Sequence, residues 1–417
     1  MSSCPKLRIE GFTDVWEQRK FVETFDFLPN NSLSRAQLTY ENGTVKNVHY
    51  GDVLIKFGEL LDVGNEELPY LIDDSLIKNY SSAVLKNGDV VIADAAEDET
   101  VGKCSEIKGI KDEKILSGLH TIPVRPRVEF ENGYLGYFMN SHSYHDQLLP
   151  LIQGTKVSSI SKKVLENTVI SYPASSSEQE KIAKFFESLT NLITLHQRKS
   201  DALKNAKKYF LKNMFPSEGE KFPKLRLEGF TDAWEQRKLG HLLEKYEDPV
   251  ETPHNGYFRL GIRSHAKGTF HSFVEPGKEL ETAKMQRVAS DKFILNITFA
   301  WEHAVAITDS NDAGKLVSHR FPQFSFTSRL KPNFFKFLML DRKFREYLEL
   351  CSPGGAGRNR VLSVKDMMKY LIKLPSVEEQ KKIGAFFENL DNLITLHQRK
   401  CDALKNAKKF FLQNMFV

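Results

Sequence analysis

Two nearly identical long segments lie about two hundred residues apart in this chain, and this internal repeat constrains the fold more than any other feature. Residues 178–215 match residues 379–416 at about 30 of 38 positions. A shorter pair, residues 5–20 and 223–238, reads PKLRIEGFTDVWEQRK and PKLRLEGFTDAWEQRK and differs at two positions. Such self-similarity indicates a repeated architecture. The chain therefore consists of a leader, an insert and a long segment, followed by the same three parts again.

Both long segments have the apolar periodicity of an amphipathic helix, with apolar residues at spacings of three and four. Ser175 and Ser376 precede them as candidate N-caps. Each copy ends in a lysine-rich stretch, which is the charge that a helix C-terminus favours. At 1.5 Å per residue, a helix of this length spans about 57 Å.

An apolar seam of this length requires a partner helix, and the other copy is the obvious partner. If the two helices lie antiparallel, the chain forms a rod with one globular insert near each end. His196 and His397 lie on the seam, and we interpret them as polar residues that fix the register rather than as metal ligands or catalytic bases. The residues expected in the helix seam and in partner docking are Ile182, Phe186, Leu189, Ile193, His196, Leu203, Phe210, Ile383, Phe387, Leu390, Ile394, His397, Leu404 and Phe411.

The repeats predict the domain boundaries. The expected parts are a leader at 1–20, a first insert domain at 21–174, a central long helix with its linker at 175–222, a second leader at 223–238, a second insert domain at 239–375 and a second long helix at 376–417. Near-identical pieces around unlike inserts indicate a fixed frame that holds two different modules of the same kind.

The inserts have the pattern of compact α+β domains. Residues 47–58 and 85–95 each predict a turn followed by a strand, because a Gly-Asp step leads into an apolar run. Residues 290–301 predict a strand, and residues 331–340 a helix. The expected fold class is α+β, with two globular domains separated by two long antiparallel helices that form a coiled-coil spacer, in a pseudo-two-fold internal repeat.

Length and cysteine usage narrow the class of protein. At 417 residues the chain is too long for one ordinary core and fits two domains. Its four cysteines lie far apart without a CxxC pair, which argues against a zinc ribbon or a disulfide framework and fits a reducing cytosol. There is no apolar core of a signal peptide, and no apolar run approaches the roughly 20 residues of a membrane span. We therefore expect a soluble, cytoplasmic protein.

The motifs of common enzyme classes are missing from the sequence. It has no GxxxxGK[ST] loop, no GxSxG elbow, no HExxH helix and no Asn-Pro-Pro-Tyr-like stretch. The glycine cluster at residues 352–360 does not open a helix after a strand, which disfavours a nucleotide cradle. His142 and His145 have the spacing of two metal ligands on a helix, but no third ligand is evident. We predict no catalytic residue and no metal site.

Charge differs between the two inserts. The formal net charge of +5 does not by itself indicate a nucleic-acid partner. The second insert has about six more lysines and arginines than aspartates and glutamates, with aromatic residues among them, a composition that suits phosphate contacts and base-edge readout. The first insert is net acidic by about eight, and only residues 103–163 are net basic. A solvated basic face, without any DNA contact, remains an alternative for the second insert.

One local pattern links the inserts. QGTKVSSIS at residues 153–161 and GAGRNRVLS at residues 355–363 both place a glycine before polar or basic residues and then an apolar-Ser pair. A glycine-hinged loop of this kind can approach a DNA backbone closely, although a plain surface loop is the alternative. The candidate DNA-binding residues are Lys103, Lys108, Lys111, Arg125, Arg127, Gly154, Thr155, Lys156, Arg259, Arg263, His265, Lys267, Trp301, Arg320, Gly357, Arg358, Asn359 and Arg360.

This arrangement of leader, variable domain and EQxKIxxFFxxLxxLITLHQRKxxALKxxKKxFLxxMF helix, given twice, resembles the specificity subunit of a type I restriction-modification enzyme. The resemblance covers the whole chain. It implies that each insert is a target recognition domain for one half of a split double-stranded DNA site. It also implies that the helices set the spacer and dock two modification subunits, which bind S-adenosylmethionine and methylate adenine. ATP and Mg would be used by separate restriction subunits that translocate and cut DNA.

Two other interpretations remain open at this stage. A protein-interaction scaffold with two adaptor domains on a coiled coil fits the acidic first insert, and the salt dependence of binding would distinguish it from DNA recognition. A metal enzyme that uses the region of His142 and His145 is the other alternative, and metal analysis of the purified protein would test it.

Overall fold

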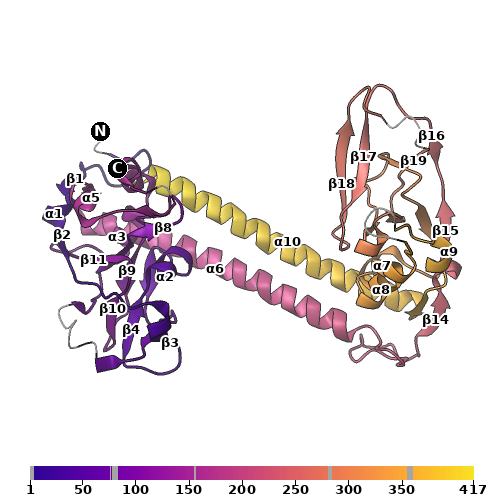
Figure 1. Cartoon of the computed structure of the whole chain (residues 1–417), viewed down its shortest axis with the longest axis horizontal. Helices are drawn as coiled ribbons and strands as arrows, with labels where there is room; N and C mark the ends of the chain where they lie inside the picture. The colour runs from indigo at the N-terminus through magenta and orange to yellow at the C-terminus, as the bar shows by residue number, and fades with distance from the viewer. Residues whose placement is uncertain (1–3, 76, 78–82, 155, 280–283, 355–359) are drawn as a thin grey trace. The chain divides into compact units, whose positions relative to one another are not determined.

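The structure, a computed structural model, describes residues 4–75, 77, 83–154, 156–279, 284–354 and 360–417. Contacts divide the chain into two compact units (Figure 1). Unit 1 comprises Met1–Gln197 and Gln398–Val417, and unit 2 comprises Arg198–His397. Each long helix therefore contributes one half to each unit. Within the described ranges, no helix combines the length and the apolar character that a membrane span requires.

Unit 1 contains a mixture of short helices and strands followed by the first half of a long helix. Its strands are β1 Glu17–Lys20, β2 Phe25–Phe27, β3 Leu38–Thr39, β4 Val45–Val48, β5 Leu60–Asp62, β6 Tyr70–Leu71, β7 Val90–Ala93, β8 Ala95–Ala96, β9 Cys104–Lys108, β10 Lys114–Ser117, β11 Thr121–Pro126, β12 Ser158–Ser159 and β13 Val169–Tyr172. Its helices are α1 Phe21–Thr24, α2 Tyr50–Ile55, α3 Tyr134–Met139, α4 His142–Leu148, α5 Lys162–Glu166 and the first half of α6 Ser176–Asn213, with 3₁₀ helices η1 Arg35–Gln37 and η3 Leu149–Leu151.

Unit 2 follows the same plan. Its strands are β14 Glu235–Lys238, β15 Leu243–Tyr246, β16 Pro249–Val250, β17 Tyr257–Ile262, β18 Thr269–Val274, β19 Met285–Arg287, β20 Phe293–Leu295, β21 Val305–Ile307, β22 Leu316–Ser318, β23 Gln323–Phe326 and β24 Leu371–Leu374. Its helices are α7 Pro332–Leu338, α8 Arg342–Leu350, α9 Val364–Met367 and the first half of α10 Val377–Asn414, with η4 Leu239–His241 and η5 Ala300–Glu302.

The two inserts share a central antiparallel sheet although their sequences do not align convincingly. In unit 1 the order β2-β11-β7-β9 is extended by β5, which pairs parallel to β9. In unit 2 the equivalent order is β15-β23-β20-β21. Each unit adds a second, different sheet, with order β10-β4-β6-β3 in unit 1 and β16-β19-β22-β17-β18 in unit 2. A common sheet inside the inserts therefore extends the repeat beyond the segments of similar sequence.

The predicted α+β fold class is confirmed, as are the strand within residues 290–301 (β20) and the helix within residues 331–340 (α7). The strand predicted within residues 47–58 is wrong, because Tyr50–Ile55 forms helix α2. His49 caps this helix by accepting the Gly51 N–H at 3.2 Å through its imidazole. Val53 is then fully buried while Ile55 is 89% exposed, so the apolar run is split between core and solvent.

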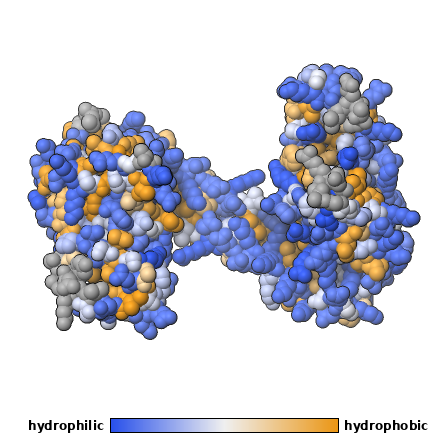
Figure 2. All heavy atoms as spheres, in the orientation of Figure 1, coloured by the Kyte–Doolittle hydropathy of each residue, from blue (hydrophilic) through white to orange (hydrophobic). Residues whose placement is uncertain are grey.

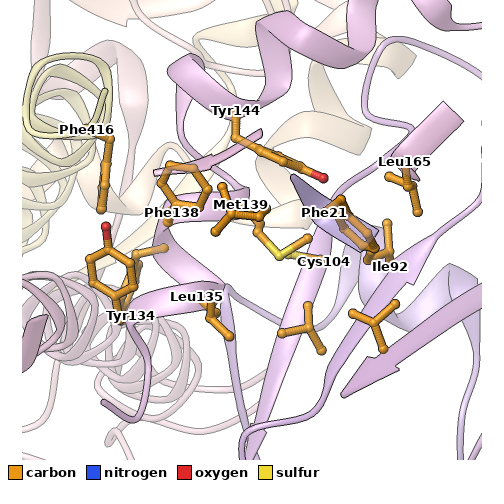
Figure 3. Packing of buried hydrophobic residues seen from close by; sticks show 14 of the residues in the cluster. Phe21, Ile92, Cys104, Tyr134, Leu135, Phe138, Met139, Tyr144, Leu165 and Phe416 are labelled. Atoms are coloured by element: carbon orange, nitrogen blue, oxygen red, sulfur yellow. The ribbon is translucent and has the colours of Figure 1, made fainter. Parts of the chain in front are cut away.

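The end of α10 completes the core of unit 1. The ring of Phe416 lies against Tyr134 and Phe138 in Figure 3, with centroid distances of 6.0 and 5.9 Å. It also contacts Trp16 of the leader at 6.3 Å and stacks on Phe186 of α6 at 5.5 Å. The core of unit 1 is therefore completed by a residue that lies more than two hundred positions after the start of α6, the long helix that follows the first insert.

The end of α6 has the equivalent role in unit 2. The ring of Phe215 lies 6.0 Å from Trp234, 5.6 Å from Phe334 and 6.1 Å from Phe387. Phe215 thus contacts the leader, the insert and α10 of unit 2, as Phe416 contacts the leader, the insert and α6 of unit 1. Each unit thus buries the end of the long helix that belongs to the other half of the chain.

Within each unit the two long helices run antiparallel. In unit 1, Phe185 meets Phe411 at 4.9 Å, and the Cys401 thiol lies 3.6 Å from the side-chain oxygen of Gln197, so positions on α10 fall as those on α6 rise. In unit 2, Phe210 meets Phe386 at 5.0 Å and Lys207 forms an ion pair with Asp391 at 2.5 Å. All of the predicted seam residues are buried or half-buried.

A buried ion pair fixes each leader to the start of its long helix. Arg8 donates two hydrogen bonds of 2.7 and 2.8 Å to Glu178, which is 1% exposed. Arg226 donates two of 2.8 and 2.7 Å to Glu379, which is also 1% exposed. The predicted cap at Ser376 is confirmed, since its hydroxyl accepts the Glu379 N–H at 3.3 Å. At the start of α6, the backbone carbonyl of Ser175 accepts the Glu178 N–H at 3.0 Å.

Apolar residues also remain on the surface of both long helices. Hydrophilic and apolar residues are interspersed over the face of each unit that Figure 2 shows. The exposed apolar positions occur as pairs 201 residues apart: Leu192 and Leu393, Leu195 and Leu396, Tyr209 and Phe410. Both helices therefore present unburied apolar or aromatic side chains at the same three repeat positions.

The burial of Phe416 gives a first testable prediction. We expect Phe416→Ala to destabilise unit 1 by about 3–5 kcal/mol, because a large aromatic side chain is removed from a packed core. Hydrogen exchange followed by mass spectrometry should show lost protection in β11 and β13 of unit 1 and unchanged protection in unit 2. Phe410→Ala is the matched control, since Phe410 is 52% exposed on the same helix. Equal exchange in the two variants would contradict the assignment of Phe416 to the core.

Candidate nucleic-acid interface

Three segments meet where strand β7 of unit 1 ends. The Asp94 N–H donates to the carbonyl of His120 at 3.1 Å, in the turn before β11. The Asp94 carbonyl accepts the Ile160 N–H at 2.9 Å, near the end of the segment 153–161. The backbone at Asp94 is thus held between a turn and a loop from distant parts of the insert. We call these three segments the strand-end cluster.

Unit 2 has the same strand-end cluster. The Ile297 N–H donates to the carbonyl of Arg320 at 3.0 Å, and the Ile297 carbonyl accepts the Leu362 N–H at 2.8 Å. Ile297 therefore corresponds to Asp94, Arg320 to His120 and Leu362 to Ile160. This agreement supports the correspondence between residues 153–161 and 355–363 that the sequence indicated. Ser161 and Ser363 also have equivalent roles, because their hydroxyls cap α5 and α9.

The side chains of the cluster in unit 1 are acidic and aromatic. The imidazole Nδ1 of His120 lies 3.3 Å from a carboxylate oxygen of Asp94, and its ring packs edge-on against Tyr50 at 5.3 Å. His49 lies behind Tyr50 at 4.7 Å. Burial raises the pKa of Asp94, an effect that the neighbouring His120 partly offsets, and burial lowers the pKa of His49.

A tight turn next to this cluster presents Lys156 to solvent. Gln153 and Ser159 exchange backbone hydrogen bonds of 3.0 and 2.8 Å, which closes the loop between them. Gly154 has a φ of +106°, and a Cβ there would lie 2.0 Å from the Val157 carbonyl oxygen, so only glycine fits. The strand β12 that follows pairs with β8, directly after Asp94. Lys156 is therefore exposed in a segment whose ends are held beside the strand end, and its DNA role stays a prediction.

The side chains of the cluster in unit 2 are basic and aromatic. The guanidinium of Arg360 lies 5.2 Å above the ring of Trp301 and donates to the carbonyls of Ser352 and Glu349 at 3.1 and 3.2 Å. His265 lies nearby, because its N–H donates to the Glu302 carbonyl at 2.8 Å. Arg320 is exposed, and its guanidinium has no ion pair or hydrogen bond within the described parts of the chain. The structure thus brings together four of the predicted residues of the second insert.

A groove of about 410 Å³ borders this cluster in unit 2. Its lining includes Ser318 and Phe321, which flank Arg320 in sequence, and residues of β17 and β18 such as Arg259. Asn296, Phe299 and Glu302, from the segment after β20, also line it. The predicted Arg263 lies at the end of β17, with its guanidinium 5.2 Å from the ring of Phe270 and a hydrogen bond to the Thr269 carbonyl. Lys267 is exposed in the adjoining turn.

Four of the five remaining predicted residues of unit 1 have partners inside the domain. Lys103 donates to the carbonyls of Leu54 and Phe57 at 2.8 and 3.1 Å, and burial lowers its pKa. Lys108 pairs with Glu187, Arg125 with Asp89 at 2.7 Å, and Arg127 with Asp26 at 2.7 Å, while Lys111 is exposed. These contacts leave the DNA role of the five residues untested, and they place none of them in the strand-end cluster. Thr155, Gly357, Arg358 and Asn359 lie outside the described residues.

The predicted metal alternative gains no support from the local geometry. The imidazole Nε2 of His145 lies 3.1 Å from the Val101 carbonyl, and that of His142 lies 3.5 Å from Asp146 on the same helix. Across the residues that the structure covers, no group of three or more metal-ligating side chains occurs. His145 thus has a hydrogen-bond partner within unit 1, His142 lies exposed beside Asp146, and the expectation of no metal site stays a prediction.

Sequence reasoning missed Tyr50, Asp94 and His120 as members of the cluster. Asp94 ends the apolar run that predicted strand β7, and a polar residue at that point was the available signal. No signal in the sequence marked Tyr50 or His120, because only the fold brings the start of α2 and the turn before β11 to the end of β7.

Comparison with known proteins identifies relatives over most of the chain. The family model described as "Type I restriction modification DNA specificity domain" matches residues 16–205 and 233–406. The type I restriction enzyme MjaX specificity subunit of Methanocaldococcus jannaschii is 25% identical over 424 residues, which cover 97% of this chain and 93% of that protein. The MjaVIII specificity subunit of the same organism is 25% identical over 272 residues, which cover 62% of this chain and 63% of that protein.

Solved structures share the fold at low sequence identity. The S subunit of a type I restriction-modification system from M. genitalium superimposes with a TM-score of 0.58 at 12% identity, over 99% of both chains. A chain from a study of complex assembly and conformational transition of the type I R-M system gives a TM-score of 0.50 at 14% identity, over 95% of this chain and 96% of that chain.

Proposed function

The chain belongs to the family of type I restriction modification DNA specificity domains, and we propose that each of its two units reads one half of a split DNA target. In this role the chain is the specificity subunit of a type I restriction-modification complex. The strand-end cluster of each unit is the surface that faces double-stranded DNA. Its side chains reach base edges, while lysines such as Lys156 contact phosphates.

The repeated cluster is the observation that best supports this proposal. Both units hold the same three segments with equivalent backbone hydrogen bonds, yet the side chains differ between Asp94 and His120 in one unit and Ile297 and Arg320 in the other. Constant backbone with variable side chains is what a bipartite, asymmetric target requires. A plain scaffold would not need two different polar clusters at equivalent positions.

We further propose that two methyltransferase subunits dock on the repeated frame. The exposed apolar pairs of α6 and α10, such as Leu192 with Leu393, provide two equivalent surfaces for two identical partners. The paired helices would also set the length of the unspecified spacer. Restriction subunits join the same complex to cleave unmodified DNA.

In this proposal the chain itself is non-catalytic and acts in the cytoplasm. S-adenosylmethionine would bind to the methyltransferase subunits, and ATP and Mg to the restriction subunits. Adenine methylation and DNA cleavage are therefore assigned to partners, and sequence choice to this chain.

Co-expression with the methyltransferase subunit from the same system tests the proposal. Long-read sequencing of the host genome should show adenine methylation in a split motif, with two short specific halves around a fixed gap. Binding of the complex to that sequence should weaken steeply as salt rises, because phosphate contacts release counterions. A well-expressed complex that adds no new methylated motif would instead favour the protein-interaction scaffold.

A further inference from the structure

In the sheet that both units share, the turn before the second strand carries chemically different side chains at equivalent backbone positions. His120 precedes β11 and Arg320 precedes β23, and the carbonyl of each accepts the N–H that follows the neighbouring strand, at 3.1 and 3.0 Å. The strand pairs that follow have the same register in both units, since Val124 pairs with Val90 and Phe324 pairs with Phe293. The two side chains therefore leave the backbone at equivalent points of the two strand-end clusters.

Arg320 offers hydrogen-bond donors only. Its guanidinium has five N–H donors in a planar fork, and within the described ranges no carboxylate or carbonyl accepts from it. The neighbouring arginines differ, because Arg360 is held by the carbonyls of Ser352 and Glu349, and Arg263 by that of Thr269. Arg320 is thus exposed beside the groove with its donors available for a ligand.

The equivalent position in unit 1 offers hydrogen-bond acceptors. Asp94 lies 3.3 Å from His120, and their side chains remain 27% and 51% exposed. When Nδ1 of the imidazole donates to the carboxylate, Nε2 is left as an acceptor and the carboxylate keeps further lone pairs. Tyr50 packs against the ring at 5.3 Å and limits its orientation. This pair therefore has the opposite hydrogen-bonding character from Arg320.

We propose that this turn position sets base specificity in both halves of the target, with Arg320 donating to a guanine in one half-site and the Asp94–His120 pair accepting from an exocyclic amino group in the other. Arginine matches the O6 and N7 acceptors of guanine, and a carboxylate matches the amino group of cytosine, or that of adenine. The proposal rests on the function proposed above and assigns individual residues to it.

Arg320→Ala in the full chain, co-expressed with the methyltransferase subunit, tests the first part. Methylome mapping should show that one guanine position in one half-site becomes degenerate, while the other half is retained. Affinity for the original sequence should fall roughly 5- to 150-fold. Arg320→Lys keeps the charge but loses the fork, so it should relax the same position. Arg342→Ala is the control, because it removes another exposed arginine charge, this one from α8, where Arg342 pairs with Glu346 at 2.8 Å.

His120→Ala tests the second part, and it should relax one position in the half-site that Arg320→Ala leaves intact. An unchanged motif in the Arg320→Ala variant, with uniformly weaker binding that Arg320→Lys restores, would identify a phosphate contact and overturn the proposal. Relaxation of the same half-site by both variants would overturn it too. If the unmodified complex produces no split motif, the proposed function itself fails. A split motif that neither variant alters refutes only the assignment of these residues.

Discussion

Replacing residues 239–375 by the insert of another specificity subunit is expected to exchange one half of the methylated DNA sequence and to leave the other half unchanged. All the residues of the strand-end cluster in unit 2, including Ile297, Arg320 and Leu362, lie within the exchanged segment. Each mismatched base pair costs about 1–3 kcal/mol, so a half-site of three pairs changes affinity by at least about 100-fold. Methylome mapping of the chimera measures the exchange directly.

The donor insert must fit the frame. Arg226 of the leader and Glu379 of α10 lie outside the exchanged segment and hold the leader to α10, while Trp234 of the leader packs on Phe334 of the insert at 5.8 Å. Phe334 and Phe337 lie inside it and pack on Phe215 and Phe387, at 5.6 and 5.0 Å, so the donor needs aromatic residues at these two positions.

A second copy of the chain's own first insert provides the matched control for this exchange. It meets the requirement for aromatic residues, since Tyr134 and Tyr137 occupy the equivalent places in unit 1. That control should produce a symmetric motif made of two copies of the first half. A chimera whose two half-sites both change would show that the inserts do not read DNA independently.

The frame was predictable from the sequence because it is encoded locally and twice. Apolar spacing along residues 178–215 is a property of neighbouring residues in one helix, so its period is visible without tertiary structure. The repeat then confirmed the pattern, since the second copy keeps the same apolar positions. The strand of β7 was predictable for a similar reason, because all four of its residues are buried and apolar.

The strand-end cluster, which we propose as the recognition surface, was less predictable because it is assembled from distant segments. His120 joins Asp94 through a turn that precedes β11, and no local pattern marks that meeting. Basic composition identified Lys103, Lys108 and Arg125, yet these cations have partners inside unit 1. An interior ion pair and a DNA contact require the same residue types, so composition alone does not separate them. The segment at residues 47–58 shows the same limit, since only burial distinguishes Val53 from the exposed Ile55.

Expression of residues 1–217 alone is expected to give a two-fold dimer. Unit 1 requires the last half of a second long helix, which α10 supplies in the full chain. The core and partly buried residues supplied by the end of α10 and the three residues after it are Phe411, Leu412, Met415, Phe416 and Val417. The first four have identical counterparts 201 positions earlier, at Phe210, Leu211, Met214 and Phe215. Val417, which corresponds to Pro216, is the one exception. Light scattering should therefore report twice the mass of the half-chain.

The charged contact of the helix end fits this dimer as well. In unit 1, Lys408 forms an ion pair with Glu59 at 2.6 Å and lies 5.5 Å above the ring of Tyr137. Lys207 is its counterpart and would meet the same Glu59 in a half-chain dimer. In unit 2 of the full chain, Lys207 pairs with Asp391 instead, and the equivalent residue of α6 is Thr190. The first half of the chain thus contains both members of the pair that it needs.

Phe215→Ala in the half-chain should break the dimer. The substitution acts at two symmetric sites, so we expect a cost of roughly 6–10 kcal/mol per dimer and a dissociation constant raised by at least about 10⁴-fold. Tyr209→Ala is the control, because Tyr209 is 56% exposed on the same helix. A stable, folded monomer of residues 1–217 would contradict the exchange of helix ends that the contacts of Phe416 and Phe215 imply. If this dimer, co-expressed with the methyltransferase subunit, directs methylation to a symmetric motif, the first half of the chain is by itself sufficient to select a DNA sequence.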